Sequence, residues 1–89
     1  MKFLDKLKGE SKDAFLGVMR EQLEQLAVSE LASGKLKSPA SLDEICGRVI
    51  KAWRKNPLTG GGLKALGVTD EELRELIKGA LTDVGVELT

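Results

Sequence analysis

Apolar residues recur three or four positions apart along most of the chain, a spacing typical of amphipathic helices. The longest such stretch runs from Lys12 to Ala32 and is followed by Gly34, a residue that commonly closes a helix. Residues 1–10 carry a shorter apolar pattern, which fits either a separate short helix or the beginning of the same one. The pattern therefore predicts a long helix in the first third of the chain.

A second helix is predicted after a polar connector, with two alternative starting points. Either Ser38 caps it with Pro39 in the first helical position, or Ser41 caps it and Glu44 completes a capping box. The helix is expected to end before Pro57, because a residue that precedes proline avoids the helical conformation. Its apolar positions share one face and are Leu42, Ile45, Cys46, Val49, Ile50 and Trp53.

A third helix is predicted after a glycine-rich connector at residues 56–68. Gly60, Gly61 and Gly62 are costly to order, so this stretch is expected to hold only a short extra helix or turn, with residues 63–66 as one helical turn closed by Gly67. Thr69 and Glu72 then have the spacing of a capping box. The following apolar residues again share one face, and they are Leu73, Leu76, Ile77, Ala80, Leu81 and Val84.

These patterns predict an all-α fold, a small bundle of three main helices plus a possible short fourth helix or turn. One domain covering residues 1–89 is expected, because this length supports a single core. The second and third helices have matching apolar faces and should pack together, with the long helix lying across them. Residues 86–89 are expected either to extend over the core or to fray.

The composition argues against catalysis. The chain has no histidine, which removes the commonest general base and the commonest transition-metal ligand. Cys46 is the only cysteine, and its place on an apolar helix face predicts a buried structural role. The acidic residues 43–44 and 70–72 stand where helices are predicted to begin and suit the helix dipole. We therefore expect no catalytic residue, metal, cofactor or small-molecule substrate, and hence a protein that is not an enzyme.

The long helix carries more apolar residues than one packed neighbour needs. A second copy of the chain could bury the surplus, and a two-fold dimer is the commonest arrangement. Alternatively, apolar residues near the two termini, such as Val86 or Leu88, cover it within one chain. The leading expectation is a helical protein–protein interaction module that binds itself as a homodimer, or another protein. The candidate self-association face is Phe15, Leu16, Met19, Leu23 and Leu26.

A basic face on the second predicted helix supports a first alternative, a nucleic-acid-binding accessory protein. Its candidate patch is Arg48, Lys51, Arg54 and Lys55. With Trp53 nearby, these side chains could hold a single strand. However, the 14 basic and 14 acidic residues of the chain cancel, which disfavours nucleic acid. Basic residues concentrate in 34–68 and acidic ones in 69–89, as expected if these segments face each other within the fold or across a dimer.

Residues 66–69, followed by Leu73 and Leu76, resemble the turn of a DNA-binding helix-turn-helix. The resemblance covers about a dozen residues and implies that the helix after Thr69 would enter a DNA groove. That helix begins with three acidic residues, 70–72, which would meet phosphates and base edges. An ordinary capped helix is therefore the expected structure here.

A second alternative is a small membrane-peripheral regulatory protein. Phe3, Leu4 and Leu7 could form the apolar side of a surface-bound helix, although Asp5 and Glu10 weaken that pattern. No run of about 18 uncharged residues could span a membrane, and no secretory leader is recognisable. A single cysteine also fits a reducing compartment. The sequence thus disfavours a membrane partner and predicts a cytoplasmic location.

Overall fold

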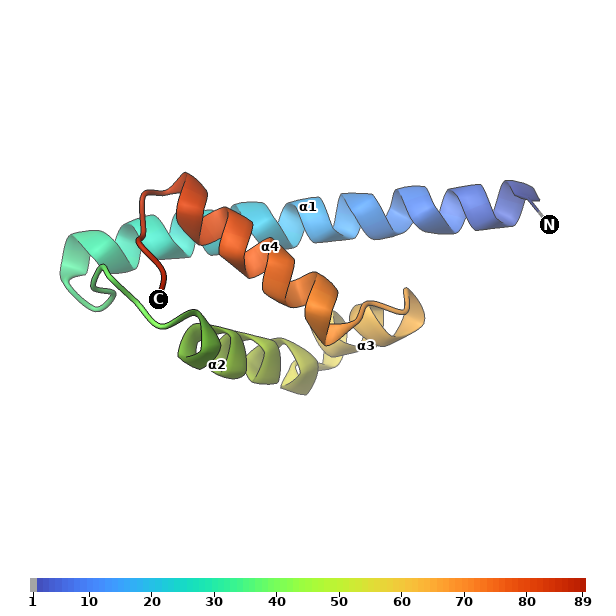
Figure 1. The fold of residues 1–89 in the computed structure, drawn as a ribbon. Helices are drawn as coiled ribbons and strands as arrows, with labels where there is room; N and C mark the ends of the chain where they lie inside the picture. The colour runs from blue at the N-terminus through green and yellow to red at the C-terminus, as the bar shows by residue number, and fades with distance from the viewer. Residues whose placement is uncertain (1) are drawn as a thin grey trace.

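The computed structural model describes the backbone of residues 2–89 and the side chains from residue 10 onward. This part of the chain is all-α and has no strand, which confirms the predicted fold class. The helices form a small bundle (Figure 1). They are α1 (Lys2–Ser33), α2 (Leu42–Lys55), α3 (Pro57–Ala65) and α4 (Asp70–Asp83).

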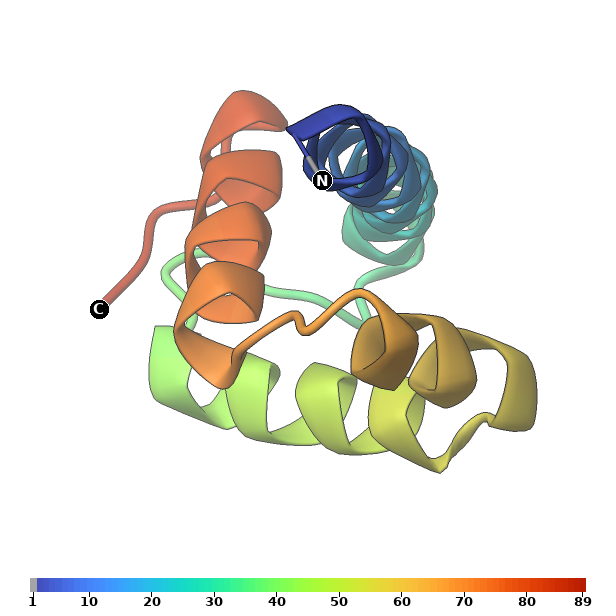
Figure 2. The same cartoon turned by 90° about the vertical axis from the view of Figure 1, so that its right-hand side faces the viewer.

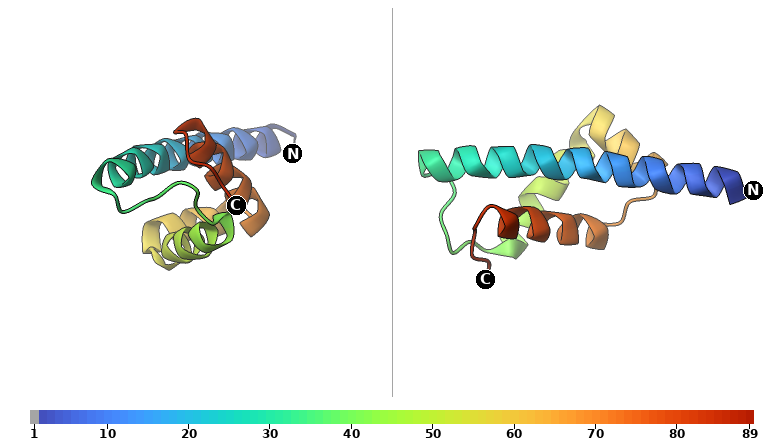
Figure 3. Two further views of the ribbon diagram at one scale, coloured as in Figure 1. Left: turned by 60° about the vertical axis from the view of Figure 1, so that its left-hand side comes forward. Right: turned by 90° about the horizontal axis from the view of Figure 1, so that it is seen from above.

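Helix α1 is one continuous helix of 32 residues, so residues 2–10 belong to the long helix rather than to a separate one. Its N-terminal part extends beyond the other three helices (Figure 3). The helix ends at Gly34, whose φ of 80° lies in the left-handed region and whose N–H donates to the Leu31 carbonyl. This is the glycine ending that the sequence predicts.

Helix α2 uses the second of the two predicted starts. Ser41 is its N-cap, and the Ser41 hydroxyl accepts the Glu44 backbone N–H at 3.3 Å. Pro39 therefore lies outside the helix, in the connector. As predicted, α2 ends before Pro57, and Asn56 is its C-cap.

Helix α3 is the short fourth helix that the sequence left open for this connector, and its nine residues begin at Pro57. Asn56 starts this helix as well as ending α2. Its side-chain oxygen accepts the backbone N–H groups of Leu58 and Thr59 at 3.0 and 3.1 Å. Pro57 follows in the first helical position, where its fixed φ and missing N–H cost nothing.

Two of the three glycines in α3 are needed where this helix meets its neighbours. A Cβ at Gly60 would lie 2.4 Å from the Arg54 carbonyl oxygen, and one at Gly62 would lie 2.8 Å from the Phe15 ring. Neither position can hold a larger residue without movement of the backbone or the ring. The glycines thus allow close packing of α3.

Helix α4 begins with the predicted capping box. Thr69 accepts the Glu72 N–H through its hydroxyl, and the Glu72 carboxylate accepts the Thr69 N–H. Val68 and Leu73 are both buried in the same cluster, as a hydrophobic staple requires. The chain turns at Gly85, with φ of 90°.

The C-terminal tail extends over the core, which decides between the two predicted alternatives. Val86 is buried in the main cluster. The Ala40 N–H donates to the Glu87 carbonyl at 2.8 Å, and the Thr89 N–H donates to the Ala40 carbonyl at 2.9 Å. These bonds hold the tail against the connector that leads into α2.

The core consists of two clusters that share α1 and α4. The larger one also uses α2 and the tail, while the smaller one uses α3 and is built on Met19, Leu63, Val68 and Leu73. Helices α2 and α4 pack together as predicted. The backbone of α1 comes close to that of α4, whereas none of its Cα atoms comes within 8 Å of α2. Figure 2, which looks along α1, shows α4 beside α1 and the α2–α3 pair below them.

Candidate functional site: an apolar groove between α1 and α2

Two adjoining hollows lie between α1 and α2. Their volumes are about 180 Å³ and about 240 Å³. Both are lined by Leu23 and Leu26 of α1 and by Val49 and Ala52 of α2, so they form one continuous groove. We call this surface the α1–α2 groove.

The groove exists because α1 and α2 both approach α4 closely, while no Cα atom of α1 comes within 8 Å of α2. Leu81 of α4 lines it where the two walls diverge, together with Ile45 of α2. Leu26 consequently has no close neighbour to cover it, and this side chain is 53% exposed. Met19 and Trp53 line the other end of the groove.

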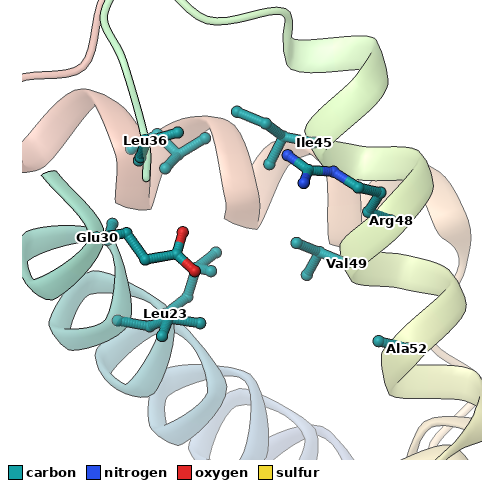
Figure 4. A pocket seen from close by; sticks show the side chains of 10 residues that line it. Leu23, Glu30, Leu36, Ile45, Arg48, Val49 and Ala52 are labelled. Carbon is teal, nitrogen blue, oxygen red and sulfur yellow. The ribbon is translucent and has the colours of Figure 1, made fainter. Parts of the chain in front are cut away.

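Two opposite charges stand at the end of the groove nearer the C-terminus of α1. Glu30 comes from α1 and Arg48 from α2, and their side chains point toward one another across the opening (Figure 4). Neither side chain takes part in any of the ion pairs formed among residues 10–89. Both charges are therefore accessible to a molecule that enters the groove.

This geometry suits an apolar helix. From Met19 to Glu30 the groove follows α1 for about three turns, or roughly 16 Å. Its walls are apolar, and charged groups occur only at the mouth, in Glu30 and Arg48. A row of apolar side chains spaced three or four residues apart would match such a surface.

The groove contains no group suited to nucleophilic catalysis. Cys46 is buried on α2 and does not line the groove. Burial raises the pKa of the Cys46 thiol, and the nearby Arg74 partly opposes this effect. A raised pKa leaves the thiol protonated and poorly nucleophilic. Among residues 10–89, no three acidic or cysteine side chains gather in a way that could hold a metal ion.

The five residues of the predicted self-association face do not form one open surface. Met19 and Leu23 are buried, while Phe15 and Leu16 are partly buried against the smaller cluster. Leu26 alone is largely exposed, and it lines the groove. Most of the apolar surplus of α1 is thus covered within one chain, chiefly by α3 and α4.

Two other exposed apolar residues of α1 lie outside the five residues of the predicted self-association face. Val18 and Val28 stand on the side of α1 away from the core and are absent from both clusters. The signal that could have found them is their place in a second, weaker stripe of α1. That stripe was hidden by the stronger pattern of leucines.

The predicted basic patch is interrupted. The Arg54 guanidinium donates to the Asp70 carboxylate at 2.8 Å and to the Val68 carbonyl at 3.1 Å, so it holds the beginning of α4. Arg48, Lys51 and Lys55 remain exposed. On the same surface, however, Arg48 and Lys51 share a shallow hollow with Asp43 and Glu44. This mixed charge is poorly suited to a polyphosphate backbone.

The side chains of Phe3, Leu4 and Leu7, on which the membrane-surface alternative depends, lie outside the described residues. No helix within residues 2–89 has both the length and the apolar character that crossing a bilayer requires.

Comparisons with protein-family models, with curated proteins and with solved structures found no match to this chain.

Proposed function

We propose that this chain is a non-enzymatic interaction module whose α1–α2 groove binds an amphipathic helix of a partner protein. The observation that carries the proposal is the groove, an elongated apolar surface between two helices whose backbones stay apart. Apolar side chains exposed in this way are stabilised when a partner removes them from water. Leu26, half exposed on one wall, is the residue that gains most from such a partner.

The charges at the mouth define the chemistry of the partner. A basic residue of the bound helix would pair with Glu30, and an acidic one would pair with Arg48. Charge pairs at the rim of an apolar contact add specificity and orientation more than affinity. The expected partner is therefore a helix with an apolar stripe and one residue of each charge at the end that meets Glu30 and Arg48.

A designed peptide tests this proposal. It should form roughly three to four helical turns, carry leucines three and four residues apart, and place one lysine and one glutamate to reach Glu30 and Arg48. We expect binding to shift the methyl NMR signals of Leu26, Val49 and Ala52. A peptide of the same composition with its leucine stripe scrambled should bind at least about tenfold more weakly, because it cannot bury the same apolar surface.

Two variants that introduce the same charged side chain at different places provide the control. Leu26→Glu places a charge in the groove and should abolish peptide binding. Leu58→Glu places the same charge on α3, where the native side chain is 87% exposed and does not line the groove, so binding should persist. Equal affinity of both peptides, or binding that survives Leu26→Glu as well as Leu58→Glu, would show that the groove is not the binding site.

A further inference from the structure

The outer side of α1 carries a second surface, separate from the α1–α2 groove. Val18 is 55% exposed and Val28 is 54% exposed, although both are apolar. They belong to a stripe whose members are alternately four and three residues apart, the spacing of a coiled-coil seam. Every member is exposed. The stripe, which we call the outer seam, is Ala14, Val18, Glu21, Gln25, Val28 and Ala32.

The outer seam reads almost the same in both directions. Around position 23, Ala14 mirrors Ala32 and Val18 mirrors Val28. The central pair consists of Glu21 and Gln25. In a second α1 that runs antiparallel and shares this centre, alanine would therefore meet alanine, valine would meet valine, and Glu21 would meet Gln25. A two-fold dimer needs such a self-complementary patch.

The central polar pair distinguishes antiparallel from parallel pairing. In the antiparallel arrangement, the Gln25 amide of one copy lies opposite the Glu21 carboxylate of the other and can donate a hydrogen bond to it. In a parallel pair, the two Glu21 carboxylates would face each other, and like charges in a seam are unfavourable. The charge pattern thus favours the antiparallel arrangement.

Gly17 provides independent support, because it stands beside the outer seam without any role inside the chain. It lies in the interior of α1, where glycine destabilises a helix relative to alanine. A Cβ at this position would meet no atom within 4 Å. A residue without a side chain on this flank of the outer seam would let a second helix approach closely, as small residues do where helix axes come near each other.

We infer that the occupant of the outer seam is a second copy of this chain, and that two α1 helices pair antiparallel about position 23. This surface differs from the predicted self-association face, most of which is buried within one chain. It is also separate from the α1–α2 groove, since no residue of the outer seam lines that groove. The existence of the dimer therefore does not depend on the proposed function.

Sedimentation equilibrium of the full chain tests the dimer. We expect a species near twice the monomer mass of 9.6 kDa. The double variant Val18→Glu, Val28→Glu should shift it to monomer while helicity by circular dichroism is retained, because both side chains are outside the core. Leu58→Glu, at an exposed position of α3, should leave the dimer intact. A monomer at all concentrations, or a dimer that survives the double variant, overturns the inference.

Charge substitutions at one position then test the orientation. Gln25→Lys places a cation opposite Glu21 of the antiparallel copy and should tighten the dimer by about three- to tenfold. Gln25→Glu should weaken it by a similar factor. In a parallel pair, Gln25→Lys would instead bring two cations together. Weakening by Gln25→Lys would therefore overturn the antiparallel arrangement.

Two glycine variants form a further matched pair. Gly17→Leu should disrupt the dimer, because the larger side chain prevents close approach of the two helices. Gly47→Leu, on α2, is the control, since Gly47 is also helical, exposed and without an atom within 4 Å of an added Cβ. Equal dimerisation of the two variants would show that α1 is not in close contact with a second copy.

Discussion

Helix α1 meets α4 and α2 in opposite ways. Where α1 crosses α4, the contact residues are small, and Ala27 and Ala80 are almost completely buried. At Gly79 of α4, an added Cβ would lie 3.3 Å from the guanidinium of Arg20. Small residues at a helix crossing allow the axes to approach, so that larger neighbours such as Ile77 become fully buried.

On the other side, α1 presents Leu26 toward Val49 and Ala52 of α2, and a groove remains between them. Apolar side chains on two facing helices are therefore not enough to bring those helices into close contact. Helix α2 is held by α4 and α3, so its distance from α1 is determined by elements that lie between them. Two helices that pack on the same third helix need not pack on each other.

The ion pairs that α1 makes with other helices also distinguish its α4 side from its α2 side. Lys12 of α1 pairs with Glu72 of α4 at 2.6 Å, and Arg20 of α1 pairs with Asp83 at the other end of α4. Such surface pairs stabilise little individually, but they mark a contact whose register is defined. The groove side has only Glu30 and Arg48, which do not pair with each other.

The largest expected change in stability distinguishes the packed contact between α1 and α4 from the open α1–α2 groove. Ile77→Ala creates a cavity where α1 and α4 meet and should lower the free energy of unfolding by about 2–5 kcal/mol. Leu26→Ala removes an exposed side chain from the groove wall and should change that free energy by less than about 0.5 kcal/mol. Urea denaturation of both variants measures the difference. Equal losses would mean that the groove is closed in solution.

A smaller effect should appear at the α2–α3 junction, which helps to hold α2 away from α1. Gly60→Ala forces a Cβ toward the Arg54 carbonyl and should destabilise the protein by about 1–3 kcal/mol. Gly61→Ala, one residue further along α3, meets open space and should be neutral or stabilising by up to about 1 kcal/mol. Thermal unfolding of the pair checks this. If both variants are equally stable, α3 does not pack against α2 as described.

The helices could be predicted from local signals. The caps at Ser41 and Thr69 and the ending at Gly34 depend on residues close in sequence. The structure has Thr69 and Gly34 where the sequence predicts them, and Ser41 is one of the two predicted starts of α2. Helix α3 was predicted only as a possible short helix or turn, because glycine has low intrinsic helix propensity. The reason for Gly62 is the Phe15 ring, which lies on another helix and leaves no local trace.

The groove could not be predicted for the same physical reason. Leu26 was recognised as part of an apolar face, but the stripe pattern does not tell which of its residues will be covered. Met19 and Leu23 lie on the same stripe and are buried, because α4 and the segments around α3 reach them. Only the positions of α2 and α4 relative to α1 decide this, and they are set by contacts between distant segments.

The smallest expected effect is a pH dependence of stability that arises where α1 contacts α4. The ion-paired hydrogen bond from Lys12, together with the Thr69 backbone N–H, lowers the pKa of Glu72 below its ordinary value of 4.5. Because the folded-state pKa lies below the unfolded one, Glu72 contributes stability above about pH 4.5, and that contribution is lost as the pH falls through the folded-state pKa. We expect Glu72→Gln to be less stable than the native chain at pH 6, with the difference shrinking as the pH approaches 3. Lys12→Met should reduce the same pH dependence from the α1 side, since it removes the largest cause of the shift. A stability difference between Glu72→Gln and the native chain that stays constant from pH 6 to pH 3, measured by urea denaturation, would show that the Lys12–Glu72 pair does not hold α1 against α4.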